Sequence, residues 1–161
     1  SVSFSLAGTF AETLVLRGTG NIGGRGGSAA ETIRGNAGAN QIAGANGNDT
    51  LLGGAGADQF RFDTALSASG NVDRLVDYSV VADTIALDRT VFKALAAPGA
   101  LPASMFRSAS GARDGSDRIV YNPDSGRLSY DADGTGPISA VLFGQMAPDL
   151  AVTAADFLIL T

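Results

Sequence analysis

The chain has 161 residues, with 22 glycines, no cysteine, no histidine and no tryptophan, and a net charge of −5 from 16 acidic and 11 basic residues. Without histidine or cysteine, the sequence excludes Ser-His-Asp and Cys-His nucleophile pairs, His/Cys zinc sites, iron–sulfur clusters and disulfides. The basic residues are spread singly and the apolar runs are short, so we expect no nucleic-acid partner and no membrane span.

The glycines are concentrated at the start of the chain, where 14 of the 22 lie in residues 1–58. We therefore divide the chain into residues 1–62 and 63–161. Four consecutive nine-residue copies occupy 26–34, 35–43, 44–52 and 53–61, and those in 35–61 are the clearest. The sixth position of each copy bears a side-chain oxygen, and the eighth is a large apolar residue: Glu31, Asn40, Asp49 and Asp58, then Ile33, Ile42, Leu51 and Phe60.

The nine-residue period predicts a coil of short parallel strands. Six Gly, Ala, Asn or Asp residues favour a turn, and the next three residues form a strand whose middle side chain points inward. Two copies complete one coil, so turns two copies apart stack on each other. We therefore expect Asp58 to lie above Asn40 and Asp49 to lie above Glu31.

Stacked carboxylates repel each other unless a cation lies between them. Ca²⁺ takes about six to eight oxygen ligands at about 2.3–2.6 Å, which turn carbonyls and side-chain oxygens can supply, whereas Mg²⁺ demands a stricter geometry. The alternative is a metal-free β-helix in which Asn and Asp side chains satisfy the backbone of the turns.

The copy Gly53-Gly54-Ala55-Gly56-Ala57-Asp58-Gln59-Phe60-Arg61 resembles the G-G-x-G-x-D-x-U-x repeat of RTX (repeats-in-toxin, hemolysin-type) calcium-binding proteins. The resemblance implies an all-β fold, in which a right-handed parallel β-roll holds Ca²⁺ in its turns. A mostly antiparallel β capping region with one short helix is expected to follow the roll.

We expect about one to three calcium ions in the stacked turns. The best site is predicted between turns 35–40 and 53–58, and a second uses turn 44–49 with Glu31 below it or Asp63 above it. The expected ligand residues are Asp58, Asn40, Asp49, Gly35, Ala37, Gly54, Gly56, Gly44 and Asn46.

Four acids that follow the repeats, Asp63, Asp73, Asp77 and Asp83, are candidates for a further ligand or for turn caps. Residues 89–96 are predicted to form a helix with Asp88 as N-cap, ended by Pro98 and Gly99.

Further along, residues 118–121 and 127–130 are predicted to form a hairpin, with a third strand over 138–143. Asp131 and Asp133 lie between these strands and most simply form a turn. A glycoside hydrolase would also use a carboxylate pair, but no cleft-forming architecture is readable in the sequence.

The C-terminal end places Asp156 directly before the apolar run Phe157, Leu158, Ile159 and Leu160. This pattern resembles the uncleaved secretion signal of serralysins and other RTX proteins, here at about residues 150–161. The resemblance implies the type I secretion machinery of a Gram-negative cell as partner and an extracellular location. The same pattern fits an ordinary last strand packed on the cap, and the two interpretations are compatible.

The functional expectation is a non-catalytic calcium-binding RTX C-terminal domain that folds when it binds extracellular Ca²⁺. We expect a monomer linked to an upstream domain, and any catalysis would lie in that domain. The alternative is a carbohydrate- or surface-binding module of a larger secreted enzyme or surface-layer protein, for which a basic or aromatic groove would be the supporting feature.

Overall fold

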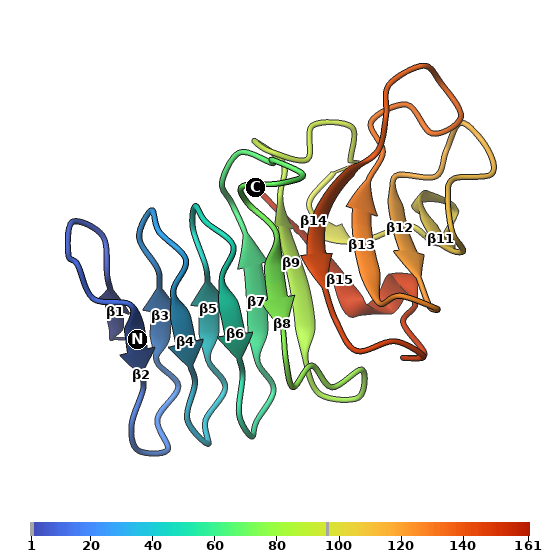
Figure 1. Cartoon of the computed structure of the whole chain (residues 1–161). Coiled ribbons are helices and arrows are strands. Elements are labelled where there is room, and N and C mark those ends of the chain that lie inside the picture. Colours follow the sequence, from blue (N-terminus) through green and yellow to red (C-terminus); the bar gives the residue numbers. More distant parts are fainter. Residues whose placement is uncertain (1, 96) are drawn as a thin grey trace.

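The computed structural model describes residues 2–95 and 97–161. Its regular elements are strands and two short 3₁₀ turns, Ala103–Met105 and Ala154–Asp156, and these described ranges contain no α-helix. The predicted all-β fold is therefore confirmed. Figure 1 shows a regular stack of coils at the N-terminal end and a more irregular cap at the C-terminal end.

Nine short strands build the coils: β1 (Ser3–Ser5), β2 (Thr13–Val15), β3 (Gly23–Arg25), β4 (Thr32–Arg34), β5 (Gln41–Ala43), β6 (Thr50–Leu52), β7 (Gln59–Phe62), β8 (Asp73–Leu75) and β9 (Thr84–Asp88). The odd-numbered strands pair in parallel in one sheet, called sheet A, and the even-numbered strands do so in the other, called sheet B. Successive strands alternate between the sheets because each is only a few residues long and ends in a turn rich in Gly, Asn or Asp.

The interior of the coils is built from two columns of stacked apolar side chains. Ile42 pairs with Phe60 across sheet A, and Ile33 pairs with Leu51 across sheet B, as the repeat predicts. All four side chains are fully buried. The parallel pairing continues through β8 and β9, across the predicted division at residues 62 and 63.

The cap closes the C-terminal end of both sheets. Its strands are β10 (Gly99–Ala100), β11 (Phe106–Ser108), β12 (Ile119–Asn122), β13 (Arg127–Tyr130), β14 (Val141–Gln145) and β15 (Phe157–Leu160). The β12–β13 hairpin is confirmed, and the predicted third strand is found slightly later, as β14. The order of sheet A is β1-β3-β5-β7-β9-β15-β10, and that of sheet B is β11-β12-β13-β14-β8-β6-β4-β2.

The helix predicted over residues 89–96 is wrong for its described part, since residues 89–95 form turns and Ala96 lies outside the described residues. Asp88 does cap the segment, because its Oδ1 accepts a hydrogen bond from the Thr90 amide at 2.9 Å. The chain makes a single turn after Asp88 and does not continue as a helix, since the Ala94 amide donates to the Tyr130 hydroxyl at 2.7 Å instead of to a helical carbonyl. The preference of the short segment is thus overridden by its packing on the cap.

Candidate metal centre

The turns of the roll form two stacks, one along each side. The first turn stack precedes the strands of sheet A, and the second turn stack precedes those of sheet B. Their sixth-position residues are, in the first stack, Asn40, Asp58 and Asp83, and in the second stack, Glu31, Asp49 and Asp73. All six are buried, with at most 8% of their surface exposed.

In the first turn stack, each acid accepts a hydrogen bond through one side-chain oxygen from the backbone amide of the sixth-position residue in the coil before it. Asp58 Oδ1 accepts from the Asn40 amide at 2.8 Å, and Asp83 Oδ1 accepts from the Asp58 amide at 2.9 Å. The predicted position of Asp58 above Asn40 is therefore confirmed.

The second turn stack repeats this arrangement. Asp49 Oδ1 accepts from the Glu31 amide at 2.7 Å, and Asp73 Oδ1 accepts from the Asp49 amide at 3.1 Å. The predicted position of Asp49 above Glu31 is thus also confirmed. In both stacks the acids do act as backbone caps, as the metal-free alternative requires, but in Asp49 and Asp58 this role uses only one of the two oxygens.

The second oxygens of three acids lie buried without a hydrogen-bond partner among the residues that the structure describes: Glu31 Oε2, Asp49 Oδ2 and Asp58 Oδ2. A buried polar oxygen that is left unpaired costs about 1–3 kcal/mol, and more when it is charged. Carboxylate oxygens are among the ligands that Ca²⁺ takes in proteins. The donor set therefore fits a calcium ion and leaves the metal-free alternative with unsatisfied atoms.

The first-position glycines make room for these oxygens. A Cβ atom on Gly44 would lie 2.4 Å from Asp49 Oδ2 and 2.7 Å from Asp73 Oδ2, so two carboxylate oxygens converge above this Cα. A Cβ atom on Gly53 would lie 2.4 Å from Asp58 Oδ2. Any side chain at these positions would displace the oxygens.

The acids in each stack would carry like charges, which repel one another. Burial, followed by interactions with Glu31, raises the pKa of Asp49, while burial and the charges of Asp49 and Glu31 raise the pKa of Asp73. Burial and the charges of Asp83 and Asp77 raise the pKa of Asp58. A divalent cation beside these groups reverses the effect, because it favours the ionised carboxylates.

Comparison with known proteins agrees with this geometry. The family model of the RTX calcium-binding nonapeptide repeat, in four copies, matches residues 25–60. Residues 25–60 are RTX calcium-binding repeats. Comparison with curated protein sequences finds no significant match.

Among solved structures, the chain resembles the AlgE6R2 subunit of the mannuronan C5-epimerase of Azotobacter vinelandii. The TM-score is 0.57, with 21% identity over 98% of this chain and 91% of that chain. At this identity the likeness concerns the fold. The repeats at residues 25–60 and this likeness in fold together support a Ca²⁺-binding β-roll module.

Asp63 does not take the predicted place above turn 44–49 of the RTX roll. Its carboxylate forms ion pairs with Arg25 at 2.8 Å and Arg61 at 3.0 Å. Asp73 occupies the predicted place instead. Asp63 follows Asp49 too closely for this place, because the chain takes 24 residues to return from Asp49 to the same stack at Asp73.

Asp73 and Asp83 continue the two stacks beyond the RTX repeats. The signal that finds them is the tripeptide of an acid, any residue and a large apolar residue, as in Asp58-Gln59-Phe60. It recurs as Asp73-Arg74-Leu75 and Asp83-Thr84-Ile85. Asp77 is a turn cap in the structure, accepting from the Gly53 and Gly54 amides at 2.8 and 3.0 Å.

Asn40 is hydrogen-bonded both within its own turn and to the coil before it. Its Oδ1 accepts from the Asn36 amide at 2.8 Å, and its Nδ2 donates to the Ile22 carbonyl at 3.1 Å. These contacts are the ones expected of a turn cap, and ligation by Asn40 stays a prediction.

The other predicted ligands are backbone positions of facing turns. Gly54 and Gly56 have positive φ, and a Cβ atom on either would strike a carbonyl oxygen of turn 35–40. A Cβ atom on Gly35 would lie 2.0 Å from the Gly53 carbonyl oxygen. Ala37 and Asn46 lie exposed at turn tips, and Gly44 is buried between turns. No three acidic side chains converge on one point in residues 2–95 and 97–161, so backbone carbonyls would have to complete any site.

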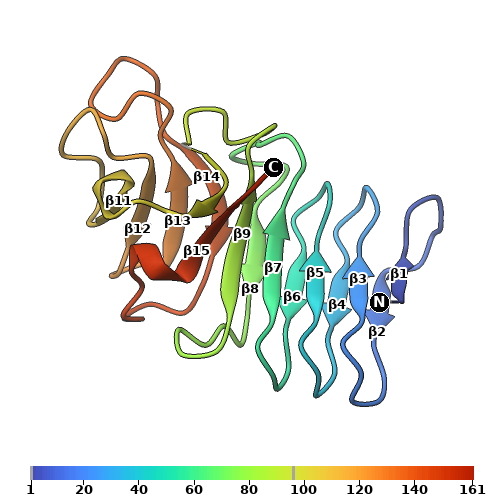
Figure 2. The same ribbon diagram turned by 180° about the vertical axis from the view of Figure 1, so that it is seen from behind.

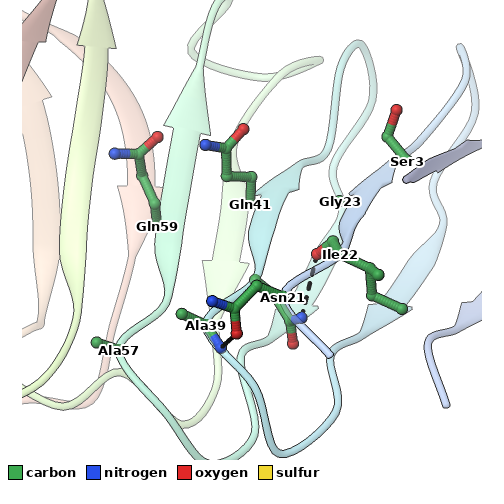
Figure 3. A pocket seen from close by; sticks show the side chains of 9 residues that line it. Ser3, Asn21, Ile22, Gly23, Ala39, Gln41, Ala57 and Gln59 are labelled. Carbon is green, nitrogen blue, oxygen red and sulfur yellow. Dashed lines mark hydrogen bonds between the residues drawn. The ribbon is translucent and has the colours of Figure 1, made fainter. Parts of the chain in front are cut away.

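A shallow groove runs beside the first turn stack, on the outer face of sheet A (Figure 3). Its polar side chains are Ser3, Asn21, Asn40, Gln41 and Gln59, and its lining has no aromatic or charged residue. This groove therefore lacks the basic or aromatic lining expected of a carbohydrate- or surface-binding module, whereas a neighbouring depression over sheet A is lined by Phe4, Arg25 and Arg61.

The structure gives two remaining candidates a place in the fold. Asp131 Oδ1 accepts from the amides of Asp133 and Gly134 at 3.3 and 2.8 Å, which is the geometry of a turn. The apolar residues of the predicted secretion signal, Phe157 to Leu160, form strand β15, and Asp156 lies directly before it. Within the described residues, no helix is long and apolar enough to cross a membrane.

Proposed function

We propose that this RTX module is a non-catalytic domain that folds when it binds extracellular Ca²⁺ and that its C-terminal segment carries a type I secretion signal. The observation that carries the calcium-dependent folding is the set of three buried, unpartnered carboxylate oxygens on Glu31, Asp49 and Asp58. They make the metal-free roll costly to form.

Calcium changes this balance because it binds only the folded roll. In the unfolded chain the acids lie far apart in solvent, and their oxygens are hydrated. A ligand that binds the native state alone stabilises it by an amount that grows with ligand concentration. Extracellular calcium modules commonly bind in the range of about 10⁻⁴–10⁻³ M, so folding would be completed outside the producing cell.

Export before folding follows from the same proposal. Inside the cell, where calcium is scarce, the chain stays loosely folded and passes through an export channel led by its C-terminal segment. Support comes from the RTX repeats, which are typical of extracellular secreted proteins, and from the acid followed by an apolar run at residues 156–160. We expect a monomer attached to a larger secreted protein.

A calorimetric calcium titration of the chain and of Asp58→Asn tests the binding part. The wild-type chain should bind calcium saturably, and Asp58→Asn should weaken binding about tenfold or remove one site, a change of about 1.4 kcal/mol or more. Asp124→Asn makes the same change on the exposed hairpin loop and should bind as wild type. Equal binding by all three chains, or none by the wild type, would refute the site.

A further inference from the structure

The C-terminal strand β15 lies inside sheet A and not at its edge. It pairs in parallel with β9 and antiparallel with β10, and Figure 2 shows it beside β9. Phe157 and Ile159 point into the core, with 2% and 1% of their surface exposed. A partner therefore reaches these side chains only after β15 has left the sheet.

Asp156 fixes the start of this strand. Its Oδ2 accepts hydrogen bonds from the Thr153 amide at 2.8 Å and from the Thr153 hydroxyl at 3.0 Å, which closes a capping box before β15. The other oxygen, Oδ1, is aimed at the roll. Asp156 is therefore an anchor that both orders the turn before β15 and faces the coils.

Tyr78 meets Asp156 from the roll. Its hydroxyl donates to Asp156 Oδ1 at 3.0 Å and lies 3.3 Å from the Asp83 carbonyl oxygen. Both side chains are buried, with 7% of Tyr78 and 6% of Asp156 exposed. These residues are 78 positions apart in the chain, so the bond joins two segments that meet only in the folded state.

The segment that carries Tyr78 also ends the first turn stack. Asp83 accepts from the Asp58 amide through Oδ1 at 2.9 Å and from the Ser79 amide through Oδ2 at 2.9 Å. The Asp83 carboxylate thus ties the turn beside Tyr78 to Asp58, whose second oxygen is free for calcium. A continuous set of hydrogen-bonded groups runs from this oxygen-lined turn to the start of β15.

We propose that the Tyr78–Asp156 hydrogen bond couples calcium binding in the first turn stack to the docking of β15. Calcium-loaded protein then withholds residues 156–160 from a partner that binds them as an extended apolar segment, and calcium-free protein presents them. This regulation rests on the proposed function. Because coupling between two sites is reciprocal, docking of β15 also strengthens calcium binding.

The test is amide hydrogen exchange of the full chain, with and without calcium, in wild type and Tyr78→Phe. In saturating calcium, Tyr78→Phe should speed exchange of the β15 amides about tenfold, because a hydrogen bond to a carboxylate is lost. Exchange of the β5 amides should stay unchanged. In chelator, both chains should exchange β15 equally fast.

Tyr121→Phe is the matched control. Tyr121 is also buried, and its hydroxyl accepts from the Leu150 amide at 3.1 Å and donates to the Ala147 carbonyl at 3.3 Å, away from the turn stacks. This variant should leave β15 exchange as in the wild type. Two results would overturn the coupling alone, provided that the wild type binds calcium. In the first, Tyr78→Phe leaves β15 exchange unchanged. In the second, Tyr121→Phe speeds β15 exchange as much as Tyr78→Phe does. Absence of calcium binding by the wild type overturns the proposed function as well.

Discussion

Asp73 lies above Asp49 and accepts the hydrogen bond of its backbone amide at 3.1 Å, although the two residues are 24 positions apart and not the 18 of the regular coil. The loop between β7 and β8 absorbs the extra residues and returns the chain to the same stack. The oxygen-lined turns therefore extend beyond the residues that follow the nine-residue period.

Asp73→Asn should have opposite effects with and without calcium. Without calcium, the substitution removes a buried charge from the second turn stack and should raise the melting temperature. With calcium, it removes a ligand oxygen and should lower the stabilisation by about 1–3 kcal/mol. Thermal unfolding with chelator and with excess calcium measures both effects. A loss of the same size in both conditions would mean that Asp73 is only a turn cap.

Gly53→Ala should destabilise the roll even though φ at this position is not in the left-handed region. The added Cβ would lie 2.4 Å from Asp58 Oδ2 and would push the carboxylate out of the turn. We expect a loss of about 1–3 kcal/mol in calcium, measured by urea unfolding. Gly111→Ala is the control, since a Cβ there meets no atom within 4 Å. Equal stability of the two variants would contradict the proposed crowding.

Ala45→Gly should stabilise the protein. Ala45 has φ of 73°, in the left-handed region, while Gly54 has φ of 93° at the corresponding second position of its repeat. Relief of the backbone strain should raise the free energy of unfolding by about 1–2 kcal/mol, and the conformational entropy of glycine in the unfolded chain offsets about half of this gain. Ala57→Gly, at an exposed turn position without positive φ, should be slightly destabilising. A lower melting temperature for Ala45→Gly would contradict this account.

The metal-free roll should be more stable in weak acid than at neutral pH. Burial and neighbouring charges raise the pKa of Asp49 to about 7 and that of Asp73 to about 8, above the value of about 3.9 for an unfolded chain. Stability from a group whose pKa is raised on folding is present below the unfolded pKa and is lost as the pH rises through the folded pKa.

The melting temperature in chelator should therefore decrease as the pH rises from about 4 to about 8. In excess calcium the carboxylates must be ionised to bind, so the trend should reverse over the same range. Identical pH profiles with and without calcium would show that the cation does not reach these acids.

The sequence predicted the roll well because its period is a direct consequence of local geometry. The six-residue turns and the inward Ile33, Ile42, Leu51 and Phe60 repeat every nine positions, and the structure stacks them in the expected register. The pairs Asp58 with Asn40 and Asp49 with Glu31 follow from the same period.

The remaining differences arise where long-range contacts decide the local structure. The segment after Asp88 has a good helix start, but Tyr130, distant in sequence, takes the Ala94 amide that a helix would need. Asp63 follows the last repeat closely, yet Arg25 and Arg61 draw it into ion pairs. No local pattern reveals Tyr130 or Arg25 as a partner, whereas the acid–x–apolar tripeptide would have pointed to Asp73 and Asp83.

The most direct test of calcium-dependent folding is far-ultraviolet circular dichroism of the full chain, in chelator and in millimolar calcium, followed by thermal melting in each. We predict that the β-sheet signal is weaker in chelator than in calcium, grows on addition of calcium, and melts at a higher temperature as calcium is raised. A full sheet signal in chelator, with a melting temperature that calcium leaves unmoved, would contradict the account.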